Sequence, residues 1–183
     1  MSSSPSPRTY SFQLALSETE LAAYFALRQQ IFCHEQALFE HSDRDAIDRH
    51  AYPIVAIAHE ASRDRVVGVV RIYEAATRLW YGGRLGVHPE FRRAGRIGKG
   101  LIQKAVTTAN TWGCDRFLAT VQHQNVRFFT RLHWRSLEEI EILARSHHLM
   151  EADLAHYPAT DQPRPPLSSC QAGPSLQSNL QVA

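Results

Sequence analysis

The sequence lacks any long apolar run. Its 183 residues contain no stretch that approaches the roughly 18 consecutive apolar residues of a membrane helix. The first eight residues, MSSSPSPR, have no apolar segment of the kind found in secretory signals. We therefore expect a cytoplasmic protein without membrane association. The length and the 44% hydrophobic content suit one domain with a single core.

Cysteine is scarce as well. Cys33, Cys114 and Cys170 are an odd number without C-x-x-C spacing, which disfavours both a disulfide framework and a zinc knuckle. The chain has ten histidines but no H-E-x-x-H or comparable ligand spacing, so we expect no metal. Three aspartates in 43–48 lack the central glycine and closing glutamate of a calcium loop.

Charges of the two signs nearly cancel, with a formal net charge of +2. This balance does not indicate a nucleic-acid-binding protein, and the basic cluster at 92–99 is not interleaved with base-stacking aromatic residues. The chain also lacks G-x-x-x-x-G-K-[ST], which disfavours a P-loop NTPase. It has no G-x-G-x-x-G after a first strand, which disfavours a dinucleotide fold.

The ends of the chain differ from its middle in composition. Residues 1–9 and 158–183 are rich in Ser and Pro and are predicted to be disordered tails, which leaves one domain over 10–157. Ser17 and Glu20 form a capping-box pattern that opens a helix to about Ile31 or beyond. Periodicity predicts further helices at 101–112 and 125–132, and strands at 11–16, 53–59, 66–74, 79–87, 116–121, 134–143 and 147–154.

The order β-α-β-β-β-α-β-α-β-β predicts an α+β fold with a mixed sheet. Its most informative segment is 85–99, where an apolar strand ends at Pro89 and EFRRAGRIGK leads into an amphipathic helix through two glycines. A helix N-terminus presents unpaired N–H groups and positive dipole charge, and glycine lets a ligand approach the backbone closely. The pattern therefore favours a phosphate site. An exposed basic helix entry with ordinary capping glycines remains the alternative.

The order of motifs is similar to that of the GNAT N-acetyltransferase family. Residues 87–92 read V-x-P-x-x-R, a glycine turn and the helix GLIQKAV follow, and FFTRLHW comes later; the likeness covers about Tyr10–Tyr157. The stretches LRQQIF-CHEQ, YGGRLGVHP and HHLMEADLAHYP resemble a narrower group, acetyltransferases encoded beside nitrilases in bacterial gene clusters. The resemblance implies a GNAT fold with a mixed, mostly antiparallel central sheet flanked by helices. It also implies acetyl-CoA as the donor and a small-molecule amine as the acceptor.

The resemblance further implies a V-shaped gap between two central parallel strands, where the pantetheine arm pairs with strand backbone. The family loop reads R/Q-x-x-G-x-G/A, and this chain departs from it. Anchoring the pattern on Gly98, which we prefer, puts Arg96 in place of the first glycine and predicts that Arg96 meets a phosphate; anchoring on Gly95 leaves an extra residue. The residues implied to bind the cofactor are Leu85, Gly86, Val87, Arg92, Arg93, Ala94, Gly95, Arg96, Ile97, Gly98, Lys99, Asn125 and Phe128.

Acyl transfer needs a deprotonated amine and a polarised thioester carbonyl. Many relatives carry a tyrosine as the acid in the short helix after the fifth strand, but Phe129 stands at that place and has no proton to give. For each carboxylate of 43–48, a surface ion pair with Arg44 or Arg49 is the alternative to a catalytic role. The candidate catalytic residues are Glu35, Asp45, His123 and His147.

We expect direct attack of the amine in a ternary complex. Two other functions stay open. The missing tyrosine also fits a non-catalytic acyl-CoA sensor or partner subunit. In addition, R-x-x-I-F followed by a glutamate and the aspartate cluster resembles acyl-homoserine-lactone and acyl-amino-acid synthases, although no Trp occurs before Trp80. A homodimer is left open as the assembly.

Overall fold

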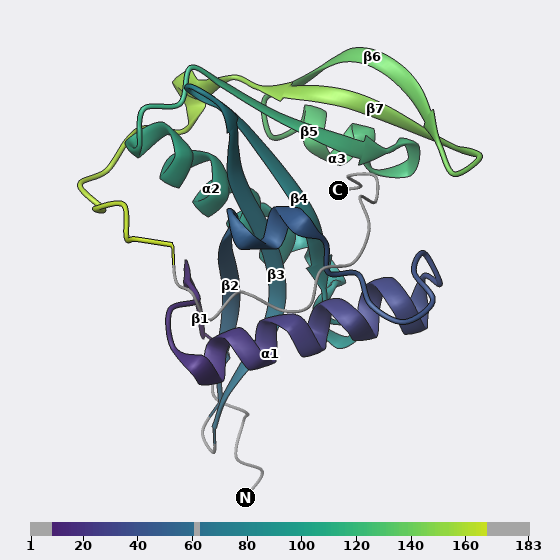
Figure 1. The fold of residues 1–183 in the computed structure, drawn as a ribbon, viewed down its shortest axis with the longest axis vertical. Helices are drawn as coiled ribbons and strands as arrows, with labels where there is room; N and C mark the ends of the chain where they lie inside the picture. Colours follow the sequence, from purple (N-terminus) through teal and green to yellow (C-terminus); the bar gives the residue numbers. More distant parts are fainter. Residues whose placement is uncertain (1–8, 61–62, 168–183) are drawn as a thin grey trace, which may run out of the picture.

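Seven strands form one sheet in the order β1-β2-β3-β4-β5-β7-β6 (Figure 1). The computed structural model describes residues 9–60 and 63–167. All neighbouring strands are antiparallel except β4 and β5, which are parallel. The elements are β1 (Thr9–Leu14), α1 (Glu18–Arg28), β2 (Tyr52–His59), β3 (Asp64–Ala76), β4 (Leu79–Val87), α2 (Arg96–Thr111), β5 (Arg116–Gln122), α3 (Val126–Thr130), β6 (Trp134–Ile142) and β7 (Arg145–Ala152).

The α+β class and the order of elements predicted from the sequence are confirmed. The Ser17 side chain accepts a hydrogen bond from the Glu20 N–H, and the Glu20 carboxylate accepts from the Ser17 N–H, which is the expected capping box at the start of α1. The helix does not end at Arg28. It continues as a π-helical segment, η1 (Gln29–Glu35), which carries the chain toward the loop after β4.

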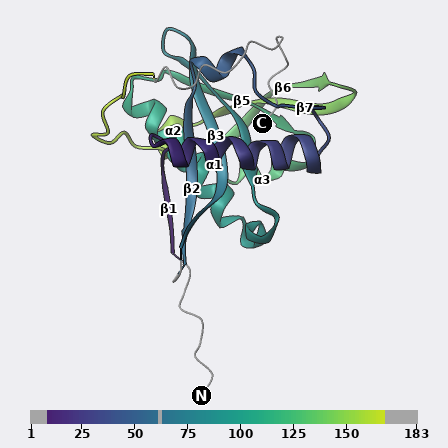
Figure 2. The ribbon, with the colours of Figure 1, turned by 60° about the horizontal axis from the view of Figure 1, so that its bottom comes forward.

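The sheet is covered on both faces. Figure 2 shows α1 crossing one face, while α2 and α3 lie on the other. Strand β2 demonstrates the division, because Ile54 and Ala56 pack into the core under α2, whereas Val55 and Ile57 pack into the core under α1. Helix α2 approaches β1 closely at Gly100, where a Cβ atom would lie 2.2 Å from the Phe12 ring. Any larger residue there would require the Phe12 ring to move.

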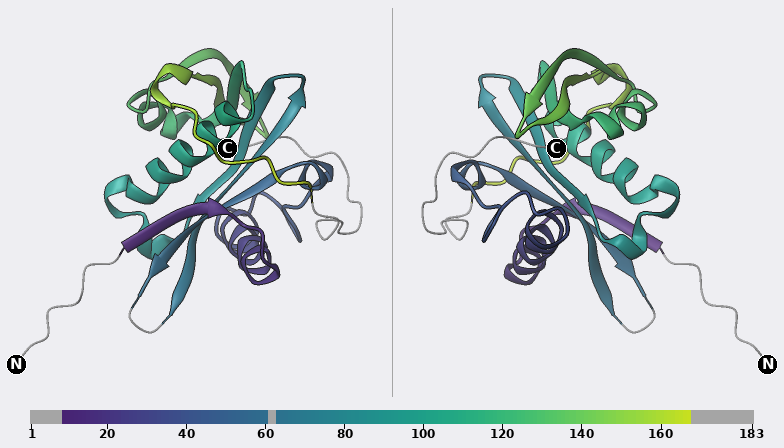
Figure 3. Two further views of the ribbon diagram at one scale, coloured as in Figure 1. Left: turned by 90° about the vertical axis from the view of Figure 1, so that its left-hand side faces the viewer. Right: turned by 90° about the vertical axis from the view of Figure 1, so that its right-hand side faces the viewer.

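The sheet divides at β4 and β5. Figure 3 shows β6 and β7 turned away from β1, β2 and β3, with β4 and β5 between the two groups. These two parallel strands pair only over Leu79–Gly82 and Arg116–Ala119. Beyond those residues, no further β4–β5 pairs occur in the part of the chain that the structure describes. The resulting gap positions the candidate site.

Parts of the two predicted tails lie within the described residues. Thr9 belongs to β1 and pairs with His59, while residues 1–8 lie outside the described residues. Residues 158–167, expected to be disordered, run back along α2. The indole N–H of Trp112 donates to the Gln162 carbonyl at 3.0 Å, and Arg164 reaches β2 and β3. Residues 168–183 lie outside the described residues. Among the described residues, no helix has the length and apolarity to cross a membrane.

Arg164 explains why this Pro-rich segment is ordered. Its Nε donates to the Tyr52 hydroxyl at 3.0 Å and its NH1 to the Glu74 carboxylate at 2.8 Å. The guanidinium also lies 4.9 Å from the Trp80 ring centroid and 5.8 Å from that of Trp112. Arginine therefore combines hydrogen bonds with stacking on aromatic rings, which offsets the entropy cost of ordering the chain.

We expect Arg164→Ala to lower the free energy of unfolding by about 1–2 kcal/mol, since it removes the ring contacts and two hydrogen bonds. Urea unfolding followed by tryptophan fluorescence measures this, because Trp80 and Trp112 both face the lost guanidinium. The control is Arg131→Ala, at an exposed arginine that directly follows α3. Equal stability of the two variants would show that Arg164 does not hold the segment.

Candidate active site

A cavity of about 500 Å³ opens where β4 and β5 separate. One wall is the end of β4, Leu85–Val87, and the opposite wall is the end of β5 at Gln122. The start of α2 and the short helix α3 close one end, and η1 closes the other. A volume of this order is typical of sites for small molecules and cofactors.

The β4 wall is irregular because the strand contains a bulge. The β3–β4 register shifts between Val69 and Arg71, and Arg84 opposite has a φ of 55°, in the left-handed region. A bulge leaves backbone groups outside the regular ladder and redirects the residues that follow it. Here those residues are Leu85–Val87, which line the cavity.

The α2 end of the cavity is built on two glycines. Gly95 is the N-cap of α2 with a φ of 65°, a conformation that favours glycine, and it has no side-chain cap. Gly98 follows in the first turn, and both glycines line the cavity. The ring of Phe128 packs against this turn, 3.3 Å and 3.5 Å from where Cβ atoms of Gly95 and Gly98 would lie. The first turn of α2 thus presents a positive helix end to the cavity.

Of the four cations expected at the phosphate loop, Arg92 lines the cavity. Its Nε donates to the Val87 carbonyl at 2.8 Å, and its two terminal nitrogens bind the Glu35 carboxylate at 2.7 Å and 2.8 Å. The hydrogen bonds from Arg92 lower the pKa of Glu35, so this carboxylate is ionised at neutral pH. The pair ties η1 to the end of β4.

The other loop residues named from the sequence lie differently. Arg93, Arg96 and Lys99 are exposed and lie outside the cavity lining, and the Arg96 guanidinium lies 5.7 Å from the Tyr10 ring centroid. Ile97 is buried in the core. Ala94 lies in the tight turn between Arg92 and Gly95. Helix α2 starts at Arg96, and the left-handed residue before it is Gly95. The alignment anchored on Gly98 expects the first loop glycine one residue later, where this chain has Arg96.

The β5 side of the cavity is polar, with Gln122, Gln124 and Asn125 in its lining. Phe128 and Phe129 complete this side. Phe129 is 3% exposed and packs edge-on against Trp134, with ring centroids 5.1 Å apart. Its position between core and cavity agrees with a packing and lining role, and its ring supplies no acid.

Glu35 is the one predicted catalytic residue in the cavity lining formed by the described residues. His123 follows Gln122 at the rim, is exposed, and contacts His148 at 3.1 Å. His147 is 2% exposed and pairs in register with Gln122; its Nδ1 contacts the Arg145 carbonyl at 2.8 Å. Both histidines lie beside the cavity rather than in its lining.

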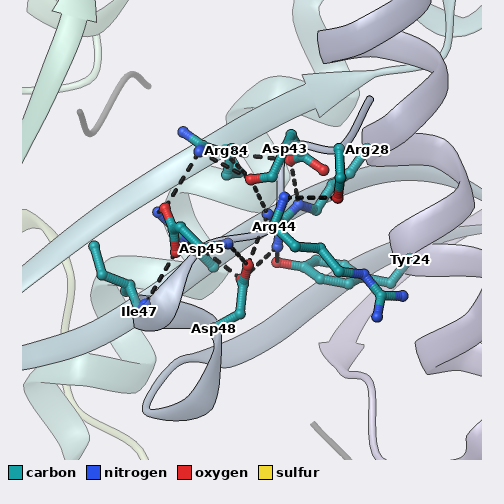
Figure 4. Close-up of polar contacts among 10 residues, drawn as sticks. Tyr24, Arg28, Asp43, Arg44, Asp45, Ile47, Asp48 and Arg84 are labelled. Carbon is teal, nitrogen blue, oxygen red and sulfur yellow. Dashed lines mark hydrogen bonds and ion pairs between the residues drawn. The ribbon is translucent and has the colours of Figure 1, made fainter. Parts of the chain in front are cut away.

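The interpretation of Asp45 as a catalytic residue needs correction, because Asp45 is buried in a charge cluster (Figure 4). Its two carboxylate oxygens accept hydrogen bonds from Arg71 at 2.7 Å and 2.8 Å, and Arg84 approaches at 3.3 Å. The side chain is 2% exposed and lies outside the cavity lining. Both carboxylate oxygens are thus occupied by arginine donors away from the cavity.

The aspartates of 43–48 also do not pair with Arg44 or Arg49, as the surface alternative expected; their partners are other arginines. Asp43 pairs with Arg28 at 2.6 Å, and Asp48 with Arg28 at 2.5 Å and with Arg71 at 3.0 Å. The Arg44 guanidinium instead lies 3.6 Å from the Phe25 ring centroid. We call the buried set the Arg–Asp cluster; its members are Arg28, Asp43, Asp45, Asp48, Arg71 and Arg84.

The Arg–Asp cluster supports the bulge of β4. Arg84 supplies both the left-handed backbone of the bulge and a side chain whose NH2 donates to the Asp43 carbonyl at 3.0 Å. Burial lowers the pKa of Arg84 to about 10, with Arg71 and Arg28 adding repulsion, but the group stays charged at neutral pH. The three aspartates balance the charge of the three arginines. The contacts of Asp43 and Asp45 with the Arg84 side chain stabilise the left-handed backbone of Arg84 in the bulge.

Two lining residues had no signal in the sequence. Gln36 lies at the end of η1, and Arg145 starts β7, whose return from β6 brings it to the cavity. Arg145 belongs to no local motif and Gln36 stands only at the end of the CHEQ stretch, so only the fold reveals that they share a cavity with Glu35. Gln36 and Arg145 line the cavity together with Glu35.

Solved structures of acyltransferases share this architecture. An acyl-CoA N-acyltransferase from Pseudomonas aeruginosa has a TM-score of 0.65 at 18% identity, covering 80% of this chain and 100% of that chain. Escherichia coli ElaA has a TM-score of 0.66 at 20% identity, covering 80% of this chain and 100% of that chain. FeeM, an N-acyl amino acid synthase from uncultured soil microbes, has a TM-score of 0.61 at 9% identity, covering 82% of this chain and 94% of that chain. No match is found among curated proteins.

The fold, with its gap between β4 and β5, is thus that of the acyl-CoA N-acyltransferases. The sequence profile of the acetyltransferase (GNAT) family matches residues 13–134, more than half of the chain. The protein belongs to the GNAT family of acetyltransferases, as the sequence motifs indicate.

Proposed function

We propose that the protein moves an acetyl group from acetyl-CoA to the amine of a small molecule, by direct attack in a ternary complex. The observation that carries this proposal is the single cavity that joins the N-terminus of α2 to the open backbone of β4. One end suits phosphates and the other suits an acceptor, so the two substrates would meet at the strand gap.

The donor would bind along the β4 side. Backbone groups of Leu85–Val87 face the gap, where the pantetheine amides would pair with them as an added strand. The N–H groups of the first α2 turn, at Gly95 to Gly98, would hold the pyrophosphate. Asn125 and Phe128 would contact the pantetheine arm from the other side.

A small void indicates a short acyl group. Between β4 and β5, an apolar space of about 20 Å³ shares Leu85 and Phe129 with the main cavity. This volume suits about one water-sized group. Phe117 and Trp134 close it on the far side, so a long acyl chain has no room there without rearrangement.

In the proposed reaction, the neutral amine nitrogen forms a bond to the thioester carbonyl carbon, and the carbon–sulfur bond breaks. Backbone N–H groups at the β4 bulge would stabilise the oxyanion. With Phe129 in place of an acid, the sulfur leaves as a thiolate, which is tolerable because a thiol has a pKa of about 8.5. The amine gives up its proton to water beside Glu35, whose own pKa is lowered by the hydrogen bonds from Arg92. The step uses no metal.

The acceptor would lie among Glu35, Gln36 and Arg145. Ionised Glu35 attracts the cationic form of an amine, and its pairing with Arg92 fixes the carboxylate in place. Arg145 supplies a positive charge for an acceptor that carries a carboxylate or phosphate. His147 would support this wall of the cavity through its contact with the Arg145 backbone.

Purified protein with labelled acetyl-CoA and a panel of small amines tests the proposal. We expect acetyl transfer to at least one amine, with acetyl-CoA preferred over long-chain acyl-CoA. Tight binding of acetyl-CoA without turnover on any amine would favour the alternative of a sensor or partner subunit. Absence of both binding and transfer would overturn an acyl-CoA function.

The second candidate is a synthase that acylates an amino acid or homoserine lactone. It is favoured by the likeness to FeeM and by the motif of Arg28 and the three aspartates. Those charged residues are buried in the Arg–Asp cluster, which gives them a structural explanation independent of any substrate. Preference for long-chain acyl-CoA in the same assay would favour this candidate.

The remaining parts of the proposal concern context. The cytoplasm suits an enzyme that depends on acyl-CoA, and Cys33 and Cys114 are free thiols, which agrees with a reducing compartment. Nucleic acid and membranes have no role in this function, and a homodimer is compatible with it. The narrower kinship with acetyltransferases encoded beside nitrilases rests on the motif resemblance, and the neighbouring genes test it.

A further inference from the structure

Three side chains with metal-binding chemistry meet beside the cavity, although they lie far apart in the sequence. His123 follows β5, Glu139 lies on β6 and His148 on β7. Each offers one ligand atom, and these atoms lie within 4.8 Å of one another. Two imidazoles and one carboxylate are a ligand set typical of zinc.

The sheet register fixes this arrangement. Glu139 pairs directly with His148 across β6 and β7, and His148 pairs with Val121 on β5, two residues before His123. A bulge between Ser136 and Glu138 shifts the β6 register, and this shift puts Glu139 rather than Glu138 opposite His148. Ligands set by strand pairing are held more rigidly than ligands on loops.

The distance between the two histidines is close to that of a metal site. Nδ1 of His123 and Nε2 of His148 are 3.1 Å apart. Two nitrogens bound to one tetrahedral zinc, each at about 2.0–2.1 Å, would be separated by roughly 3.3 Å. Small rotations of the exposed side chains would therefore admit an ion between them and Glu139.

The hydroxyl groups of Ser136 and Ser146 contact and orient two of the ligands, His148 and Glu139. Nδ1 of His148 contacts Ser136 Oγ at 2.8 Å, which points Nε2 toward His123, where both imidazoles could bind one cation. Ser146 donates to Glu139 Oε1 at 2.6 Å, which orients the carboxylate beside the two imidazoles.

We propose that His123, Glu139 and His148 form a zinc site on the face of the β5–β7–β6 sheet, separate from the acyl-transfer chemistry. The ion would connect the turn after β5 to the β6–β7 hairpin. That turn carries Gln124 and Asn125, two lining residues of the cavity. Zinc would therefore stabilise one wall of the cavity without entering the reaction. The spacing of histidines in the sequence gives no sign of this site, because its three residues come from three elements.

Calorimetric titration of the metal-free protein with Zn²⁺ tests the site, with thermal unfolding as a second measurement. We expect one zinc per chain and a higher melting temperature in its presence. His148→Gln and Glu139→Gln should each weaken binding more than tenfold, and Ser136→Ala should weaken it about tenfold through the lost orientation of His148. Circular dichroism before titration shows that each variant is folded.

The control is His156→Gln. His133 and His156 form a second exposed histidine pair, but their rings stack in parallel with centroids 3.5 Å apart, so their nitrogens do not converge on one point. This variant should bind zinc like the wild type. Absence of stoichiometric binding by the wild type, equal binding by folded His148→Gln, or a loss confined to His156→Gln would overturn the proposal.

Discussion

Replacing Gly98 with valine is expected to raise the KM for acetyl-CoA by more than about tenfold, a loss of over roughly 1.4 kcal/mol of donor binding. Gly98 lies in the first turn of α2 and lines the cavity where the pyrophosphate would sit. A Cβ atom at position 98 would lie 3.5 Å from the Phe128 ring, which is an ordinary van der Waals contact. We therefore expect the Gly98→Val variant to fold. The two branching methyl groups of valine would instead occupy the space that the phosphates need.

Steady-state kinetics and calorimetric titration with acetyl-CoA measure the effect. The control is Thr107→Val on the same helix, which also places a valine on α2 but outside the cavity lining, where the native threonine already has the same branched shape. Its KM should equal that of the wild type. If folded Gly98→Val bound acetyl-CoA as tightly as the wild type, the phosphates would have to lie elsewhere.

Replacing Asp48 with alanine is expected to lower the free energy of unfolding by about 3–5 kcal/mol. The Asp48 carboxylate accepts hydrogen bonds from Arg28 at 2.5 Å and from Arg71 at 3.0 Å. Both arginines are at most 1% exposed, so the variant would leave buried positive charge without its partner. Loss of one member of a buried ion cluster costs far more than loss of a surface pair.

Denaturant unfolding at neutral pH measures this loss, with Asp64→Ala as control. Asp64 also contacts a basic side chain, His59 at 2.9 Å, but is 66% exposed, so its loss should cost less than about 1 kcal/mol. A cost below about 1 kcal/mol for Asp48→Ala would mean that the Arg–Asp cluster does not hold the fold.

The same cluster predicts how acid affects stability. Burial alone would raise the pKa of Asp48, but attraction and hydrogen bonds from Arg28 outweigh it and lower the pKa from 3.8 to about 2. A carboxyl whose folded pKa is depressed stabilises the protein above its unfolded pKa. Asp48 therefore contributes its full share above about pH 4 and loses it as the pH falls toward 2. The wild type should lose this increment in that range, whereas Asp48→Ala should not.

The sequence predicts those parts of the fold that depend on local patterns. Strand β4 has the expected bounds because an apolar run from Leu79 to Val87 ends before Pro89. The capping box at Ser17 likewise needs only four neighbouring residues. The two glycines at the start of α2 could be read as a phosphate-binding turn for the same reason, since helix-end geometry is local.

The parts that the sequence could not reveal depend on distant partners. Asp43, Asp45 and Asp48 lie in a polar stretch that looks solvated, and their burial follows only from arginines on α1, β3 and β4. Arg164 lies in a Pro-rich segment whose composition predicts disorder, but aromatic rings more than 50 residues away hold it. Local composition cannot register such contacts, because they form when the sheet assembles.

The short pairing of β4 with β5 has a consequence for the behaviour of the protein in solution. Past Gly82, the β5-facing side of β4 has no ladder partner among the described residues, which amounts to a strand edge inside the sheet. Unprotected edges invite pairing with other chains, and proteins usually shield them. A donor molecule lying in the gap would shield this one. While it is bound, the cosubstrate would then also act as an eighth strand and disfavour self-association of the enzyme through this edge.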